Sequence, residues 1–297
     1  MPCVANPFHV RALPERLALV PRPLPPAGRL LALTRAGIWV LFVLALANGA
    51  FLYLAPSQAL THYAWSIKPP VSAAFIGAGF LAGTLVTGLV LAVTRRWRSL
   101  QTLPPALWVL ATSLLAATIV HHGKFKFDYP PTWVWVIVYA GVPLAVPILV
   151  YRQRRAAESR PAADPTLRVT KVLSAVIGAL LLAGAVALYA APVAVGKHWP
   201  WLLTPLLGRV VAAWYALFGT MLVSCAVGLR HASEAVLPYV TLAAWCLLLL
   251  ALPLLHPGDV DTGTTAFWLW TAGMVVLLAL ALHALSRALP AARRSRL

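Results

Sequence analysis

The sequence predicts an all-α integral membrane protein with eight transmembrane helices, arranged as two parallel four-helix repeats with both termini in the cytoplasm. Three observations lead there: the composition, a series of long apolar stretches, and a residue pattern that recurs after about half of the chain. Of the 297 residues, 61% are apolar and 10% are charged, and the mean hydropathy is +0.82. Soluble domains carry about 25% charged residues, and disordered chains are polar and highly charged. Both classes are therefore excluded.

Eight apolar stretches approach or reach the roughly 20 residues that a helix needs to cross the hydrocarbon layer. They lie at 36–55, 71–94, 105–121, 132–150, 172–192, 207–228, 237–255 and 266–286. An open sheet would leave backbone groups unsatisfied in lipid, and barrel strands would alternate in polarity. Because these stretches are continuously apolar, we expect helices.

Polar, basic segments divide the chain around these stretches. We predict a Pro-rich cytoplasmic tail at 1–35, a first repeat at 36–151, a cytoplasmic linker at 152–171, a second repeat at 172–286 and a basic tail at 287–297. The first tail is basic throughout and precedes a full-length span, so it is not expected to be a signal peptide.

Small residues and prolines predict how the helices pack and bend. Alanines recur every four residues at Ala74, Ala78 and Ala82, which favours close approach of another helix. Prolines inside two of the stretches are expected to bend or open those helices: Pro143, Pro147 and Pro253.

The distribution of positive charge predicts the orientation. The chain has 24 Lys and Arg against 7 Asp and Glu, a net charge of +17. With a cytoplasmic N-terminus, 19 of the 24 cations fall on inner segments, as the positive-inside rule requires. Every basic cluster lies beside a helix end, which predicts anionic lipid at the cytoplasmic face as a partner and excludes nucleic acid. Without organelle signals, we expect a bacterial inner (plasma) membrane; no oligomeric state is predicted.

Identical residues recur in order at a shift of 136 or 135 positions. The pairs include Tyr53 with Tyr189, His62 with His198, Trp65 with Trp201, His121 with His256 and Trp135 with Trp270. Four spans per half give both halves the same orientation, so their pseudo-twofold axis should follow the membrane normal. A central cavity between the halves is then expected.

The leading functional hypothesis is non-enzymatic: binding or transport of a small anionic or amphiphilic molecule in an outer-face cavity between the repeats. Lys68 and Arg209 lie at the outer starts of two spans, where helix N-termini favour anions, and Trp65 and Trp201 flank the entrance. Seven tryptophans fall at outer boundaries and predict an interfacial belt: Trp65, Trp133, Trp135, Trp199, Trp201, Trp268 and Trp270.

The outer histidines offer an alternative function. Four of them form the two repeat-related pairs, and imidazole binds haem iron or copper. The alternative is therefore a membrane redox protein with ligands among His62, His121, His198 and His256. A second alternative is a structural subunit of a membrane complex. No cofactor motif or mid-membrane carboxylate is present, and Cys3, Cys225 and Cys246 are expected to be packing residues.

The two long outer turns carry opposite charges at matching positions. Lys124 and Lys126 in the first correspond to Asp259 and Asp261 in the second. The sequence therefore suggests a weak electrostatic latch between the halves, because exposed ion pairs contribute only about 0–1 kcal/mol.

Overall fold

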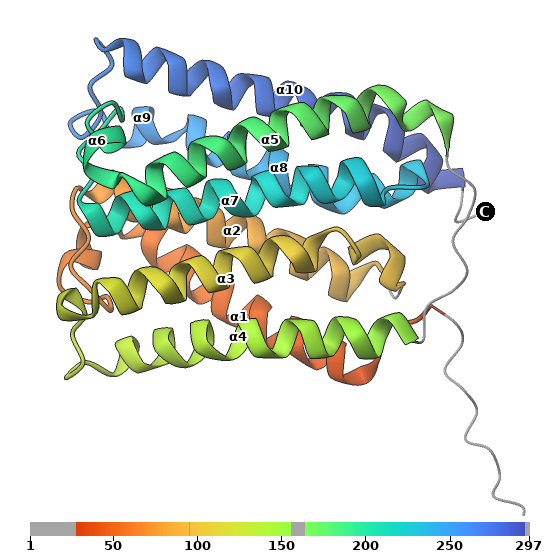
Figure 1. Ribbon diagram of the computed structural model, residues 1–297, viewed down its shortest axis with the longest axis horizontal. Coiled ribbons are helices and arrows are strands. Elements are labelled where there is room, and N and C mark those ends of the chain that lie inside the picture. The colour runs from red at the N-terminus through yellow and green to blue at the C-terminus, as the bar shows by residue number, and fades with distance from the viewer. Residues whose placement is uncertain (1–27, 95, 156–163, 295–297) are drawn as a thin grey trace, which may run out of the picture.

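The computed structural model describes residues 28–94, 96–155 and 164–294, and within these ranges it is all-helical (Figure 1). Eight helices there are long and apolar enough to cross a membrane. The all-helical architecture and the eight candidate spans are therefore confirmed. Residues 1–27 and 156–163, which hold Cys3, most of the predicted first tail and part of the predicted linker, lie outside the described residues.

The helices long and apolar enough to span are α1 (Ala32–Leu54), α2 (Pro70–Ala92), α3 (Leu103–Val120), α4 (Pro130–Arg155), α5 (Arg168–Ala190), α7 (Pro205–Gly228) and α10 (Thr265–Arg294). The remaining candidate span, Ala232–Leu255, contains α8 (Val236–Leu250). Two short helices, α6 (Pro192–Gly196) and α9 (Leu252–Leu255), and five 3₁₀ turns connect them: η1 (Pro56–Leu60), η2 (Trp97–Leu100), η3 (His122–Lys124), η4 (Pro165–Leu167) and η5 (Ala232–Ala235). The expected bounds differ by five residues or fewer, except that α10 continues beyond position 286 to Arg294.

Proline sets the start of several helices. Pro70, Pro130 and Pro205 are the first residues of α2, α4 and α7, where a missing N–H costs nothing. The Thr204 hydroxyl accepts from the Leu207 N–H and caps α7. At the start of α2 the Asp259 carboxylate accepts from the Val71 N–H at 3.0 Å, so an acid from the second half caps a helix of the first.

The internal prolines behave differently in the two predicted places. Helix α4 continues through Pro143 and Pro147. Because Pro147 has no N–H to offer the Pro143 carbonyl, that oxygen is available, and the Trp108 indole donates to it at 3.1 Å. At Pro253 the predicted opening is present, since α8 ends at Leu250 and α9 begins at Leu252.

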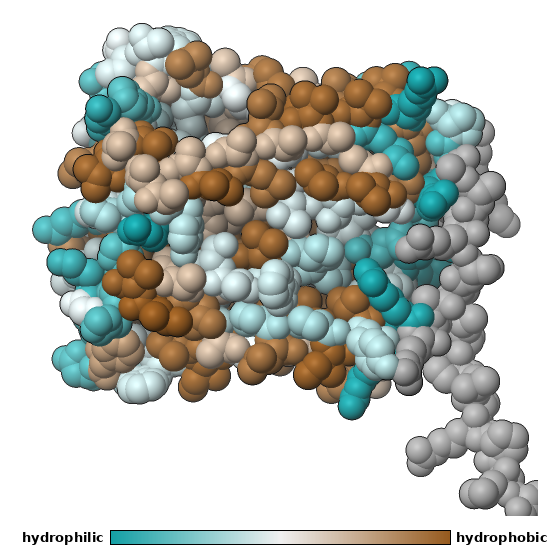
Figure 2. Space-filling model, viewed as in Figure 1, coloured by the Kyte–Doolittle hydropathy of each residue, from teal (hydrophilic) through white to brown (hydrophobic). Residues whose placement is uncertain are grey.

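Helices α2, α3, α7 and α8 pack together at the centre, with α1, α4, α5 and α10 around them. The difference is plain in burial: 61% of the α8 span is buried, against 11% of the α4 span. Figure 2 shows apolar side chains along the length of the bundle and hydrophilic ones at its two ends. Such a surface suits a bilayer, where apolar side chains face lipid and polar ones face headgroups and water.

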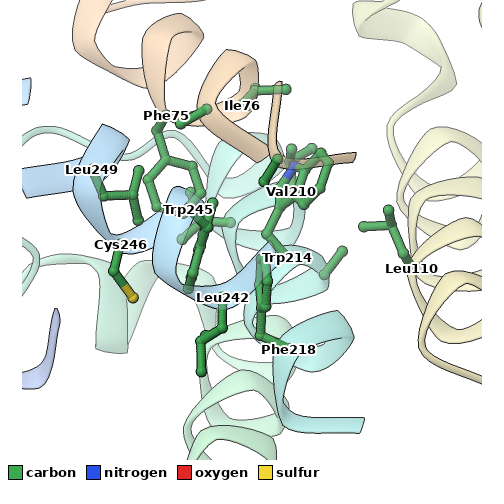
Figure 3. Packing of buried hydrophobic residues seen from close by; sticks show 14 of the residues in the cluster. Phe75, Ile76, Leu110, Val210, Trp214, Phe218, Leu242, Trp245, Cys246 and Leu249 are labelled. Atoms are coloured by element: carbon green, nitrogen blue, oxygen red, sulfur yellow. The ribbon is translucent and has the colours of Figure 1, made fainter. Parts of the chain in front are cut away.

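Aromatic side chains fill the centre of the bundle (Figure 3). The rings of Phe218 and Trp245 stack at 4.0 Å, and Phe80 meets Trp214 edge to face at 5.2 Å. A Cβ atom at Gly79 would lie 2.5 Å from Cζ3 of Trp214, so only glycine lets α2 approach α7 this closely. The expected small face of α2 is confirmed, because Ala74, Ala78 and Ala82 are fully buried.

Several contacts recur at the offsets that relate the halves of the sequence. The Tyr53 hydroxyl donates to the Leu248 carbonyl at 2.9 Å, and the Tyr189 hydroxyl donates to the Ser113 carbonyl at 2.7 Å. Both bonds cross between halves. Two backbone hydrogen bonds recur at the same offsets, one within each half: Lys126 N–H donates to the Ala64 carbonyl at 2.9 Å, and Asp261 N–H donates to the Pro200 carbonyl at 3.2 Å.

Candidate functional site: a groove between α5 and α10

A groove of about 470 Å³ lies between α5 and α10 in the second half of the chain. Its volume is in the range typical of small-molecule sites, about 300–1,000 Å³. Its walls come from α5, α7, α10 and the turn after α6: Ile177, Leu180, Leu181, His198, Trp199, Pro200, Tyr215, Ala266, Leu269, Trp270, Gly273, Met274, Val276 and Leu277. Since α5 and α10 are outer helices of the bundle, the groove lies on the outer surface of the bundle.

The groove is apolar over most of its length. On α5 it extends from Leu181 to Ile177, which is 13 residues before the helix end at Ala190. On α10 the lining runs from Ala266 to Leu277, about 16 Å along the helix axis at 1.5 Å per residue, which is about half of a hydrocarbon layer of about 30 Å. Its long apolar walls are therefore suited to an extended hydrocarbon chain.

Polar groups gather at the end of the groove nearest the loops. His198 is exposed there, and the Trp199 indole N–H is buried without a hydrogen-bond partner among the described residues. Deeper in the groove the Trp270 indole donates to the Tyr215 hydroxyl at 3.1 Å. Because that hydroxyl oxygen accepts from Trp270, its own proton is free to point to another acceptor.

Two residue differences between corresponding positions of the halves explain why the groove lies in the second half. Gly273 and Met274 of α10 stand 135 positions after Val138 and Tyr139 of α4. Tyr139 is buried, with its ring 4.2 Å from that of Trp135, so this part of the first half is filled. At Gly273, by contrast, a Cβ atom would meet nothing within 4 Å.

The position of the groove differs from the expectation of a cavity between the halves. Between the halves, large rings of α7 and α8 pack directly against α2: Phe75 lies 6.1 Å from Trp245 and 6.2 Å from Tyr215. Sequence reasoning placed the cavity between the two halves, but aromatic rings fill this contact between α2, α7 and α8.

Of the eight residues expected to line the site, His198 lines the groove and the other seven do not. His62 and Lys68 are exposed, and His256 is partly exposed. Trp65 and Trp201 are buried in two aromatic clusters, where Trp65 packs 4.8 Å from Trp135 and Trp201 packs 5.5 Å from Trp270. A belt residue must face the headgroups, so the predicted tryptophan belt is wrong for the four buried residues: Trp65, Trp135, Trp201 and Trp270. Trp133 and Trp268 are exposed, as a belt requires.

The two remaining predicted residues, His121 and Arg209, meet each other instead. Arg209 Nη1 donates to His121 Nε2 at 2.8 Å, and the guanidinium lies over the Tyr189 ring at 5.9 Å from its centroid. Burial, followed by the charges of Arg209 and Lys124, lowers the pKa of His121 below its ordinary value of 6.5. This contact joins the end of α3 to the first turns of α7.

The expected latch between the outer turns is wrong. The Lys126 ammonium donates to the carbonyls of Leu60 and Thr61 in its own half. Asp259 caps α2, and the Asp261 carboxylate accepts from the Gly263 N–H in its own turn. Backbone groups take up the charges of Lys126, Asp259 and Asp261, and among the described residues no ion pair joins Lys124 or Lys126 to either acid.

The histidines do not form a metal centre within the described part of the chain. No group of three or more His, Cys, Asp or Glu there could hold a metal ion. His62 is bonded to Thr61 and His121 to Arg209. Cys225 and Cys246 are buried free thiols, in agreement with packing roles. The haem or copper alternative gains no support from this arrangement.

Sequence reasoning missed the residues that shape the groove, chiefly Tyr215, Gly273 and Met274. One signal was available: Gly273 interrupts an apolar helix at a position where the first half has a bulky Val138. Comparison with protein-family models, with curated proteins and with solved structures gives no match for this chain. Its function is therefore argued from the groove itself.

Proposed function

We propose that this multi-pass membrane protein binds an amphiphile, a molecule with one hydrocarbon chain and a small polar or anionic head, in the groove between α5 and α10. The observation that carries the proposal is a site-sized groove on the lipid side of the bundle with one polar end. The hydrocarbon chain would lie along Leu180, Leu181 and Leu277, and the head would lie at His198.

The chemistry of the walls favours this class of ligand. A fully polar molecule would lose its hydration against leucine and methionine walls without replacement hydrogen bonds. A purely apolar one would leave the polar end unused. An amphiphile enters laterally from the bilayer, so its chain never leaves hydrocarbon. Transport would extend this binding if the ligand then left at the His198 end.

We further propose that the chain consists of two parallel repeats, with both termini in the cytoplasm of a bacterial plasma membrane and the polar end of the groove outside. The repeats are supported by the reciprocal bonds of Tyr53 and Tyr189, which join halves at equivalent positions. The orientation is supported by the 19 of 24 cations on the inner segments. Under this orientation, the groove draws its ligand from the outer leaflet.

The test fills the groove with a side chain. Gly273→Leu places four carbons where the structure has open space, and leucine is a better helix former than glycine, so folding should be preserved. Gly141→Leu on α4 is the matched control, because its surroundings are also open and it does not line the groove. The ligand is a palmitate analogue with a photoreactive diazirine in its chain, added to purified protein in micelles.

We expect the palmitate analogue to crosslink to peptides that contain residues 177–181 and 266–277. Crosslinking should fall at least about fivefold in Gly273→Leu, an effect of roughly 1 kcal/mol, and stay unchanged in Gly141→Leu. Equal crosslinking in all three proteins, or labelling spread over the lipid-facing helices, would overturn the proposal.

A further inference from the structure

A second cavity, of about 160 Å³, lies where α1 begins and α2 ends. It is at the opposite end of the bundle from the His198 end of the groove (Figure 1). Two arginines, Arg29 and Arg35, form its polar wall together with Thr94, and Leu30, Val90 and Leu91 form its apolar wall. At about 30 Å³ per water molecule, it holds the volume of about five waters.

The backbone beside this cavity is held in place from both sides. Arg29 forms an antiparallel bridge with Arg96, and the Trp97 N–H donates to the Gly28 carbonyl at 2.9 Å. On the other side the buried Gln153 amide donates to the Arg29 carbonyl at 2.8 Å and accepts from the Leu31 N–H at 3.0 Å. The segment that carries Arg29 is therefore fixed before any ligand binds.

The positive charge at this cavity is uncompensated within the described residues. No acid there lies within ion-pair distance of Arg29 or Arg35; the ion pair that the described residues contain joins Arg98 to Glu234 at 3.4 Å. Arg35 lies in the first turns of α1, a helix without an acidic residue in its first turn. Since helix N-termini carry partial positive charge, the start of α1 adds to the field of both guanidinium groups.

We propose that this cavity binds a phosphate group, with Arg29 and Arg35 as its ligands. Guanidinium groups match phosphate oxygens in pairs of parallel hydrogen bonds. The cavity lies at the ends of two spans, where lipid headgroups lie, and its apolar wall suits the glycerol and first chain carbons of a phospholipid. The phosphate is either that of an anionic phospholipid or free inorganic phosphate, and the experiment separates the two. The site is independent of the α5–α10 groove.

The experiment measures lipid retention by native mass spectrometry of the full chain, after exchange into micelles that contain phosphatidylglycerol. The test variant is Arg29→Gln with Arg35→Gln. The control is Arg287→Gln, an exposed arginine near the same end of the bundle that does not line the cavity. Arg35→Lys keeps the charge and loses the planar fork. Inorganic phosphate is titrated separately into lipid-free protein by calorimetry.

We expect the double variant to bind its first phosphatidylglycerol at least about tenfold more weakly, as loss of charged hydrogen bonds predicts. Arg35→Lys should weaken it severalfold, and Arg287→Gln should stay within about twofold. Loss of inorganic phosphate binding in the double variant, with lipid binding unchanged, would identify free phosphate as the ligand. Equal weakening in the Arg287→Gln control, or no weakening of either ligand in the double variant, would overturn the site.

Discussion

At the scale of single residues, one imidazole joins the two halves at the loop end of α3. Arginine only donates hydrogen bonds, so His121 Nε2 must accept from Arg209 and carry no proton. Burial and the nearby Arg209 and Lys124 lower the pKa of His121. A histidine whose folded pKa lies below 6.5 contributes stability that is present above that pH and is lost as the pH falls through the folded value. We therefore expect the protein to be less stable at about pH 5 than at about pH 7.5.

The measurement is the free energy of unfolding in micelles at both pH values. His121→Gln cannot titrate, so its stability should change less between the two pH values than that of the unmodified chain. His62→Gln serves as the control, because His62 is exposed and bonds to its neighbour Thr61. If the His121→Gln protein lost as much stability on acidification as the unmodified chain, the pH dependence would belong to another group.

At the scale of helices, the closeness of α2 and α7 depends on Gly79. Gly79→Ala would place a Cβ atom 2.5 Å from the Trp214 ring, and a buried ring in a packed centre has little room to move. We expect a loss of about 1–3 kcal/mol, as for other overpacked cores, measured by denaturant unfolding in micelles. Gly141→Ala should cost no stability, since its Cβ would contact no described group within 4 Å beyond the local helix backbone, and alanine is a better helix former than glycine. Equal stability of Gly79→Ala and Gly141→Ala would show that α2 and α7 can move apart to admit the added methyl group without a loss of stability.

The positions of helix ends were the easiest part of the fold to predict from the sequence. Which side of each helix is buried was the hardest. Prolines such as Pro70 and Pro205 are favoured at the first residue of a helix, and both begin helices within two residues of the expected starts at 71 and 207. The prediction that the tryptophans at outer boundaries form a belt was wrong for the buried ones because the protein core and the lipid are both apolar. Hydropathy alone therefore does not separate the buried Trp135 from the exposed Trp133, two residues away.

At the scale of the whole molecule, the class and the eight spans followed from composition, because hydrocarbon demands long apolar helices. The candidate site did not follow. Its volume depends on what side chains leave unfilled, and single differences such as Gly273 for Val138 decide that. Of the expected residues, only His198 lines the groove. Charged and aromatic residues are as common at contacts between helices as at ligand sites, and Arg209 and His121 form such a contact.

The orientation of the bundle decides from which leaflet the groove takes its ligand. In our proposal the turns holding Gly123 and Gly258 are outside, and the end of α4 that holds Arg154 is inside. Both glycines have open surroundings, so Gly123→Cys and Gly258→Cys should be accepted. The native Cys225 and Cys246 are buried, and Cys3→Ser removes the third thiol.

We expect a membrane-impermeant maleimide to label both turn cysteines on intact cells, whereas Arg154→Cys should be labelled only after the membrane is opened. The reverse pattern would place the polar end of the groove in the cytoplasm and the Arg29 cavity outside. Labelling of one turn without the other would contradict two parallel repeats, because equal orientation of the halves requires both turns to share a side. The two turns thus test orientation and repeat architecture separately.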